Sequence, residues 1–328
     1  MLKVGLNPYG LAFHLGLQGG GTARANPNGT GIGGFIAIAR QIGAKTLELH
    51  GPWLHGMDSA ALHALRQRIE ALGMTPVVGT GLAQETPERA IAAAAALGAK
   101  IVRLALTPVL CGGRAELGGK WPELVAGVRA ALRHWAPLAA GQGITLAIEN
   151  HQDFRSTELV AFCQEAGPGT GICFDTGNAF PVGEAPLDFA RSIAAHVRHV
   201  HLKDYQVQRT PEGIRLVRCA IGDGAVPFAG IAVLLAQHHP SLTASLEPGA
   251  LEARHVQLLR PEWWAMYPPL GADALAACLA ATQLNSLADG ADFRTPGERG
   301  ERAEILVEYA RAMIRRSAAN MRALGLMQ

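Results

Sequence analysis

The chain has 328 residues, 49% of them hydrophobic, so it can bury the core of one large domain or two ordinary ones without disulfides. Its 29 basic and 27 acidic residues leave a net charge of +2, which gives no reason to expect nucleic acid or an anionic membrane as a partner. Its five cysteines form no CxxC pair, and the sequence shows neither a signal peptide nor an apolar run of the ~20 residues that a membrane span needs, so we expect a cytoplasmic protein with free thiols.

Short β-like runs alternate with helical runs along the whole sequence. We predict strands at residues 2–7, 46–50, 75–80, 100–106, 144–150, 170–175, 197–204 and 242–248, and helices at 35–43, 59–73, 86–98, 121–143, 156–167, 185–196 and 227–238. A glycine-rich loop at 10–34 follows the first strand and is long enough to form a lid. A second loop, rich in charge, is predicted at 205–226.

Eight strands that alternate with helices indicate parallel pairing through right-handed crossovers. Over roughly 250 residues this pattern predicts an α/β fold, a (β/α)8 TIM barrel with a C-terminal helical extension. We therefore divide the chain into a catalytic barrel at 1–250 and a helical extension, packed on the barrel, at 251–328. An open doubly wound sheet is the alternative, but the segment at 16–26, "GLQGGGTARAN", lacks the GxGxxG spacing of that fold.

Four of the predicted strands close on a residue that can bind a metal ion. Glu149, Asp175, His201 and Glu247 end the fifth, sixth, seventh and eighth strands. Barrel active sites lie at the carboxyl ends of the strands, and neighbouring strands lie about 4.8 Å apart, so these four side chains can converge on one ion. Three carboxylates and one imidazole suit Mn²⁺, Mg²⁺ or Co²⁺, whereas zinc prefers more nitrogen or sulfur. Taken singly, each residue has a plainer reading: Asp175 could cap a helix, and His201 could be a hydrogen-bonded core histidine.

The motifs "AIENH", "CFDTGN", "HVHLKDY" and "SLEPG" stand around these four residues in this order. Together they resemble the xylose-isomerase-like TIM-barrel superfamily, the sugar phosphate isomerase/epimerase group, which includes ketose 3-epimerases, inosose dehydratases and inosose isomerases. The resemblance covers roughly residues 1–250. It implies that Glu149, Asp175, His201 and Glu247 are the metal ligands and that the two glutamates are the acid/base pair. One departure is Asn178, which stands where the ketose epimerases have a histidine.

These observations predict a divalent-metal-dependent isomerase/epimerase that acts on a keto-sugar or keto-polyol through a metal-stabilised enediolate. We expect one divalent cation, Mn²⁺ first and Mg²⁺ or Co²⁺ as alternatives, an unphosphorylated carbohydrate as substrate and a homo-oligomer as the assembly. The alternative is a lyase of the same family on an oxidised sugar: a 3-keto-glycoside β-eliminase, a dehydratase or a keto-sugar-acid decarboxylase. A nuclease of this barrel type would need more metal ligands and a basic groove, and a non-catalytic binding barrel would not need four ligands.

Further residues are predicted to take part in the site. His151 lies two residues past Glu149 and Lys203 two past His201, so strand alternation puts each on its neighbour's face, and both are predicted to be catalytic together with Glu149 and Glu247. The predicted substrate-binding residues are His14, Glu48, Arg103, Asn178 and Arg209. The alternatives are a histidine satisfied within its loop, a lysine or buried arginine paired with an internal acid, and a solvated loop arginine.

Overall fold

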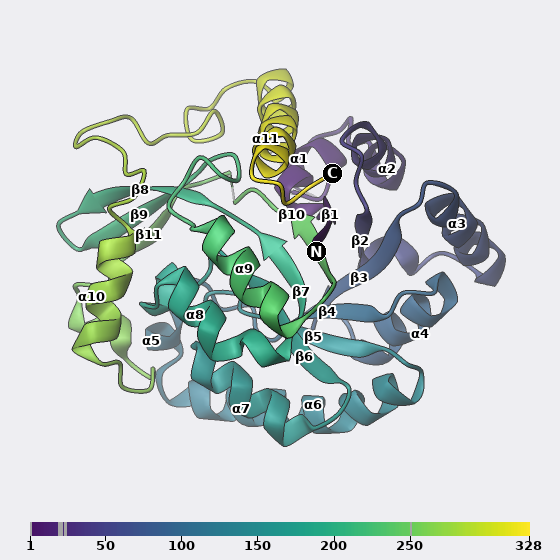
Figure 1. Cartoon of the computed structure of the whole chain (residues 1–328), viewed down its shortest axis with the longest axis horizontal. Coiled ribbons are helices and arrows are strands. Elements are labelled where there is room, and N and C mark those ends of the chain that lie inside the picture. Colours follow the sequence, from purple (N-terminus) through teal and green to yellow (C-terminus); the bar gives the residue numbers. More distant parts are fainter. Residues whose placement is uncertain (1, 19–21, 23–24, 250) are drawn as a thin grey trace.

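The computed structural model describes residues 2–18, 22, 25–249 and 251–328, and its centre is a closed barrel of eight parallel strands (Figure 1). Around the barrel the strands follow the order β1 (Leu2–Leu6), β10 (Leu242–Leu246), β7 (Val197–Leu202), β6 (Thr170–Asp175), β5 (Thr145–Glu149), β4 (Ile101–Ala105), β3 (Thr75–Gly81) and β2 (Thr46–His50). The strands are buried almost throughout, as expected for a parallel sheet covered on both faces. The predicted (β/α)8 TIM barrel is confirmed.

Helices cover the outside of the barrel. The crossover helices are α2 (Gly31–Gln41), α3 (Ser59–Ala71), α4 (Pro87–Leu97), α6 (Trp121–Gly141), α7 (Ser156–Ala166), α8 (Pro186–Ile193) and α9 (Phe228–His238). In α4 the buried residues Ala90, Ile91, Ala94 and Leu97 recur at helical spacing, and Gly98, with φ of 72°, ends the helix. Within the described part of the chain, no helix combines the length and the apolar character needed to cross a lipid bilayer.

Short helices fill several of the connections. These are η1 (Tyr9–Leu11), α1 (Ala12–Leu15), η2 (Gly51–Leu54), α5 (Gly113–Leu117), η3 (Gly118–Lys120), η4 (Phe180–Val182), η5 (Ala194–His196) and η6 (Pro261–Trp264). The predicted loop at 10–34 therefore contains α1 and the start of α2. The lid proposed for that loop lies partly outside the described residues, which omit 19–21 and 23–24.

Most of the segment after the seventh barrel strand is a β-hairpin, so the prediction of a charged loop at 205–226 was wrong for residues 205–218, whereas residues 219–226 do form a loop. Strands β8 (Tyr205–Thr210) and β9 (Gly213–Arg218) pair antiparallel, and β11 (Arg254–Val256) adds a third strand beside β9. Apolar residues alternate with polar ones in both arms of the hairpin, and Val207 and Leu216, which face each other, are fully buried. Of the charged residues that suggested a loop, Glu212 lies in the turn and Arg215 on the other face, whereas Arg209 and Arg218 lie at the ends of the face that contains Val207 and Leu216.

The last helix, α11 (Ala303–Ala323), occupies the position of the eighth barrel helix. It contacts α1 and β10, and its buried stripe contains Leu306, Ala310, Ile314 and Met321 (Figure 1). Its far end reaches α2, where Arg322 Nη2 donates to the carbonyl of Ile42 over 2.6 Å. The domain boundary at residue 250 stays a prediction, but α11 covers the barrel between α9 and α2 as an ordinary barrel helix does.

A buried arginine joins the segment before α10 (Ala272–Ala281) to the barrel. The guanidinium of Arg114 lies 4.2 Å from the ring of Trp121 and 3.9 Å from that of Tyr267, and its Nη2 lies 2.7 Å from Glu158 Oε2. It also donates to the carbonyl of Met266 over 3.0 Å. Arg114 therefore ties the chain around Tyr267 to α5 and α7.

Candidate metal centre

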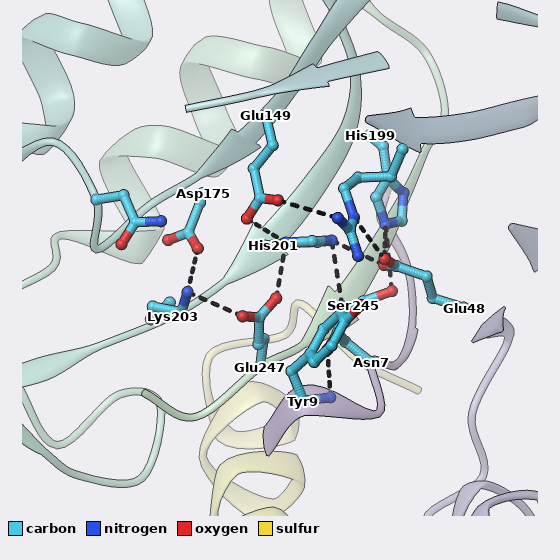
Figure 2. Close-up of polar contacts among 12 residues, drawn as sticks. Asn7, Tyr9, Glu48, Glu149, Asp175, His199, His201, Lys203, Ser245 and Glu247 are labelled. Atoms are coloured by element: carbon cyan, nitrogen blue, oxygen red, sulfur yellow. Dashed lines mark hydrogen bonds and ion pairs between the residues drawn. The ribbon is translucent and has the colours of Figure 1, made fainter. Parts of the chain in front are cut away.

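Four strand ends bring Glu149, Asp175, His201 and Glu247 to one place at the carboxyl end of the barrel (Figure 2). Glu149 and Asp175 are the last residues of β5 and β6, His201 is the second-last of β7, and Glu247 follows β10 directly. Asp175 pairs in register with His201, which sets their side chains at the same height in the barrel. One ligand atom from each of the four residues lies within 4.8 Å of all the others.

The imidazole of His201 lies at the centre of this acidic cluster. Its Nδ1 lies 3.2 Å from Glu149 Oε1 and 2.7 Å from Glu247 Oε2, and Figure 2 shows the two glutamates on opposite sides of the ring. All four residues are buried, from 0% exposed for Asp175 and His201 to 8% for Glu247. Buried carboxylates at such distances repel one another unless cations lie between or beside them.

Glu48 fixes the orientation of His201 from below. Its Oε2 lies 2.7 Å from His201 Nε2, and because a carboxylate only accepts, the Nε2–H of the imidazole is the donor. Nδ1 faces Glu149 and Glu247, so a metal ion bound there would replace its proton, in the carboxylate–histidine–metal arrangement found in many metalloproteins. Glu48 in turn accepts from Arg103 Nε over 3.0 Å. His201, His199 and Arg103 outweigh the effect of burial and hold the pKa of Glu48 well below its usual value, so it stays ionised.

Lys203 stabilises the other side of the cluster. Its Nζ lies 2.9 Å from Glu247 Oε1 and forms a short ion pair with Asp175 Oδ2. Burial alone would lower the pKa of Lys203, but Asp175 and Glu247 raise it well above its usual value, so the ammonium is charged. The lysine therefore holds two candidate ligands in place.

Burial and neighbouring charges shift the pKa values of the three carboxylates in the cluster in different directions. Burial raises the pKa of Asp175 to about 7 although Lys203 acts against it. For Glu149, burial also favours the neutral acid, but Arg103 and His201 outweigh this and lower its pKa. Glu247 behaves like Glu149, with Lys203 and His201 overcoming the effect of burial.

The donor set fits a divalent cation. Four carboxylates (Glu48, Glu149, Asp175 and Glu247) face two permanent cations, Arg103 and Lys203, which leaves a formal charge of −2 with His201 in the neutral form that a metal ligand requires. Glu247 Oε2 is buried, and its 2.7 Å contact with His201 Nδ1 is not aligned as a hydrogen bond. An ion of charge +2 bound by three carboxylates and Nδ1 cancels this charge and supplies the missing contact.

A cavity of about 500 Å³ opens onto the cluster, within the range typical of small-molecule sites. Of the residues predicted for the site, those in its wall are Arg103, Glu149, His151, Lys203 and Glu247. Burial lowers the pKa of His151, and its buried Nδ1 has no hydrogen-bond partner, so this histidine faces the cavity as a neutral base. The wall also contains Leu251, Glu252, Arg254 and Ala310, so chain beyond residue 250 contributes to it.

Four predicted substrate-binding residues lie outside this wall. Glu48 lies below His201 and contacts it instead of the cavity. His14 is a buried residue of α1, and its Nε2 lies 3.4 Å from Thr30 Oγ1. Asn178 is fully covered and accepts from Gln152 Nε2 over 2.9 Å. Arg209 is 58% exposed on β8 and pairs with Asp289 at 3.6 Å, because the segment predicted as a loop is a hairpin that carries this side chain away from the cluster.

Several residues of the site escaped the sequence reasoning. His199 lies two residues before His201 on the same face of β7 and contacts Glu48, Thr243 and Ser245. The two histidines of the motif "HVHL" are the sequence feature that could have predicted it. Tyr9 lines the cavity and lies 2.9 Å from His50 Nδ1, just after the first strand. Gln152, also in the wall, has a φ of 73°, which is uncommon for a residue other than glycine and often marks a functional site.

A second group of possible metal ligands comprises Cys173, His199 and His201. Burial raises the pKa of the Cys173 thiol to about 12, so without a metal ion it is a neutral thiol. Since His199 is already hydrogen-bonded to Thr243 and Ser245, this group forms the polar floor of the acidic cluster.

Comparisons with known proteins agree with this architecture. A model of the xylose isomerase-like TIM barrel family matches residues 36–263. Over 106 residues the chain is 32% identical to the uncharacterized protein YihM of Escherichia coli strain K12, a match that covers 31% of this chain and 32% of YihM. The chain thus matches about a third of the length of that curated relative.

Solved structures share the fold at low sequence identity. The chain is similar to a D-psicose 3-epimerase in the presence of D-fructose, with a TM-score of 0.53, 18% identity and coverage of 89% of this chain and 93% of that chain. It is similar to the IOLI protein with a binding zinc atom, with a TM-score of 0.53, 13% identity and coverage of 86% and 96%. A xylose isomerase-like TIM barrel protein from Mycobacterium smegmatis in complex with magnesium has a TM-score of 0.50 at 16% identity, with coverage of 83% and 86%.

Proposed function

We propose that this chain, which belongs to the xylose isomerase-like TIM barrel family, is a divalent-metal-dependent isomerase or epimerase that acts on a keto-sugar or keto-polyol. The observation that carries the proposal is that Glu149 and Glu247 lie on two sides of His201 and that both carboxylates line one cavity. A carbon next to a carbonyl, held between two carboxylates, can lose a proton to one and regain it from the other. The likeness to a D-psicose 3-epimerase supports this choice.

The two glutamates are suited to proton transfer because they approach from different parts of the barrel. Strands β5 and β10 are separated by β6 and β7, so a substrate between the two carboxylates offers them opposite faces. Arg103 lowers the pKa of Glu149 and Lys203 lowers that of Glu247, so either carboxylate can accept the first proton. Return of the proton to the same carbon inverts it, and return to the neighbouring carbon moves the carbonyl.

We propose one divalent cation held by Glu149, Asp175, His201 and Glu247, with Mn²⁺ first and Mg²⁺ or Co²⁺ as alternatives. When bound, such an ion supplies Lewis-acid polarisation of the carbonyl oxygen, which makes the neighbouring carbon more acidic. The structures with magnesium and with zinc, whose fold is similar, support a divalent ion without selecting one. The predicted homo-oligomer remains a prediction, which light scattering of the purified protein tests.

A lyase on an oxidised sugar is the second candidate. The observation that favours it is His151, a neutral histidine of the cavity wall that a two-glutamate epimerisation does not use. An elimination or a decarboxylation needs one base and a separate acid, and His151 with one glutamate supplies both. Release of water, an alcohol or CO₂ from a 3-keto-sugar or a keto-sugar acid distinguishes a lyase from an epimerase.

Solvent exchange tests the proposed proton transfer. Enzyme reconstituted with Mn²⁺ is incubated in D₂O with a panel of ketoses and 3-keto-sugars, and deuterium uptake at the carbon next to the carbonyl is measured by NMR. Glu149→Gln and Glu247→Gln keep an oxygen ligand but remove the base, so each is expected to lower exchange by about 10²-fold or more. Glu88→Gln, an exposed residue of α4, is the matched control. Exchange that persists in both active-site variants at full metal occupancy would exclude this pair as the bases.

A further inference from the structure

Arg218 is a buried cation in the cavity wall without an acidic partner. It ends β9, is 5% exposed and lines the same cavity as Glu149 and Glu247. Its Nη2 donates to the carbonyl of Gly10 over 2.7 Å, its Nε is buried without a hydrogen bond, and no carboxylate of the described residues lies within 4 Å of it. The guanidinium lies 5.4 Å from the ring of Tyr309 in α11.

The other buried arginines of the described chain differ from Arg218 in this respect. Arg103 pairs with Glu48, and Arg114 pairs with Glu158. For Arg155, burial lowers the pKa, but Glu184 and Glu158 lie near enough to raise it. Burial also lowers the pKa of Arg218, and the groups that oppose this are two tyrosines and a cysteine, with no carboxylate among them.

A charge buried in this way is unfavourable by itself. Taking a guanidinium out of water costs several kcal/mol unless a counter-charge and hydrogen-bond acceptors replace the solvent. Its planar fork of N–H donors matches a carboxylate or a phosphate, the two anions that arginine binds in bidentate fashion. An oxyanion in the cavity beside Arg218 supplies both the missing charge and the missing acceptor.

Arg254 stands beside Arg218 in the same small sheet. It pairs across β11 and β9 with Leu216, two residues from Arg218, so strand alternation places both arginine side chains on one face. Arg254 also lines the cavity, and no acid of the described residues lies within 4 Å of its guanidinium. Glu252 in the same wall is exposed to solvent and pairs with neither arginine.

We propose that Arg218 and Arg254 form an oxyanion subsite, so that the substrate is a sugar derivative with a carboxylate or a phosphate group. This inference rests on the proposed function, because it assigns the reacting end of the substrate to the acidic cluster and its anionic end to the sheet of β8, β9 and β11. It narrows the substrate class from neutral ketoses to keto-sugar acids or keto-sugar phosphates. It also gives residues beyond 250 a direct part in specificity.

Three probes with one carbon chain test the subsite. D-glucitol is neutral, D-gluconate has a carboxylate and D-glucitol 6-phosphate has a phosphate. Their binding to the full-length protein is measured by ligand-observed NMR titration in the presence of a chelator, so that no metal ion contributes to anion binding. The wild-type protein is expected to bind at least one anionic probe about tenfold more tightly than glucitol, since hydrogen bonds to charged groups are stronger than those to neutral hydroxyls. The anion that is preferred identifies the group.

The variants assign the preference to the two arginines. Arg218→Gln is expected to abolish it while leaving glucitol binding within about twofold, and Arg254→Gln to reduce it about threefold. Arg209→Gln, an exposed arginine outside the cavity, is the matched control and should keep the full preference. Equal binding of the three probes by the wild-type protein, or an unchanged preference in Arg218→Gln, would overturn the proposal. If Arg218→Gln does not fold, Arg254→Gln decides: an unchanged preference in that variant also overturns it.

The test is independent of the metal site. Asp175→Ala removes a candidate metal ligand but leaves both arginines, so it should retain the anion preference. Failure of the proton-transfer experiment with an intact preference would refute the proposed reaction and not the subsite. Loss of the preference with normal deuterium exchange would refute the subsite and not the reaction.

Discussion

His201 Nε2 lies 2.7 Å from Glu48 Oε2, and the two residues come from strands β7 and β2 on different sides of the barrel. The contact passes through the barrel interior below the acidic cluster. It therefore makes the orientation of one candidate metal ligand depend on a strand that contributes no ligand itself. Arg103, which contacts both Glu48 and Glu149, joins β4 to the same network.

Glu48→Gln is expected to weaken metal binding about tenfold. Glutamine can still accept a hydrogen bond from Nε2–H, but it no longer makes the imidazole more basic. Mutation of a residue that hydrogen-bonds a metal-bound histidine typically lowers metal affinity or activity 10–100-fold. Competition with a fluorescent chelator measures the dissociation constant for Mn²⁺. Glu85→Gln, which alters a histidine–glutamate pair with His55 away from the cluster, should bind Mn²⁺ as the wild-type protein does. Equal affinity in both variants would show that Glu48 does not act on the ion.

Asp175→Ala is expected to remove the ion altogether. The change deletes one of three carboxylates and leaves Lys203 to pair with Glu247 alone, so the site loses both a ligand and negative charge. Elemental analysis after reconstitution with Mn²⁺ should give one ion per wild-type chain and less than about a tenth of that in the variant. Asp188→Ala, a surface change in α8, is the control. Full occupancy in the Asp175 variant would exclude this residue as a ligand.

Arg114→Ala is expected to lower the free energy of unfolding by about 3–5 kcal/mol, because it leaves Glu158 without its partner and opens space between Trp121 and Tyr267. Urea denaturation followed by circular dichroism measures the change. Arg129→Ala breaks an exposed pair with Glu165 and should cost less than about 1 kcal/mol. Similar losses in the two variants would contradict a specific role of Arg114 in holding the segment around Tyr267.

Asp153 predicts a dependence of stability on pH. Burial raises its pKa from 3.8 to about 7, although a hydrogen bond from Thr107 acts against this. Between these values the folded protein binds more protons at this site than the unfolded chain, so Asp153 lowers stability as pH rises from about 4 to about 7, by at most about 1.4 kcal/mol per unit. Asp153→Asn should therefore gain stability relative to the wild-type protein across this range. The difference in unfolding free energy should stay flat for the exposed control Asp289→Asn. A flat difference for Asp153→Asn as well would mean that this carboxyl titrates normally.

Ile314→Ala is expected to lower the free energy of unfolding by about 2–4 kcal/mol because this side chain lies on the buried face of α11 and is fully buried. Ile305 lies on the same helix but is 37% exposed, and its change to alanine should cost less than about 1 kcal/mol. Thermal and urea denaturation measure the loss of stability in each variant. Equal effects would contradict the placement of α11 on the barrel.

The sequence predicted the barrel because its signal is repeated eight times. Each strand but the last is a short apolar run followed by a helical period, so errors in single boundaries do not change the count. The four residues at the strand ends could be predicted to meet for the same reason, since equivalent positions of successive units lie at one end of the barrel. The description of Asp175, His201 and the two glutamates as one cluster needed no knowledge of side-chain conformation.

The other features of the site could not be predicted, because they depend on contacts between residues that are far apart in the sequence. Glu48 was expected to bind substrate, but its partner His201 lies far away in sequence, and only the closed barrel shows that it contacts the imidazole. The hairpin of β8 and β9 was missed because its charged residues hid the alternation of Val207 and Leu216 with polar neighbours. Because of that error Arg209 was misplaced and Arg218 was overlooked, and Arg218 matters because no acid among the described residues pairs with it.

The position of α11 has a consequence for the order in which the protein can fold during synthesis. All eight barrel strands and all four candidate metal ligands precede α11 in the sequence, so a growing chain can pair β10 with β1 before the helix that covers them has been made. Until then the apolar surface under Ile314 and Met321 is exposed to water and to other nascent chains. Chaperones that bind hydrophobic segments on the ribosome would meet the barrel in this open form, and completion of α11 would end their access.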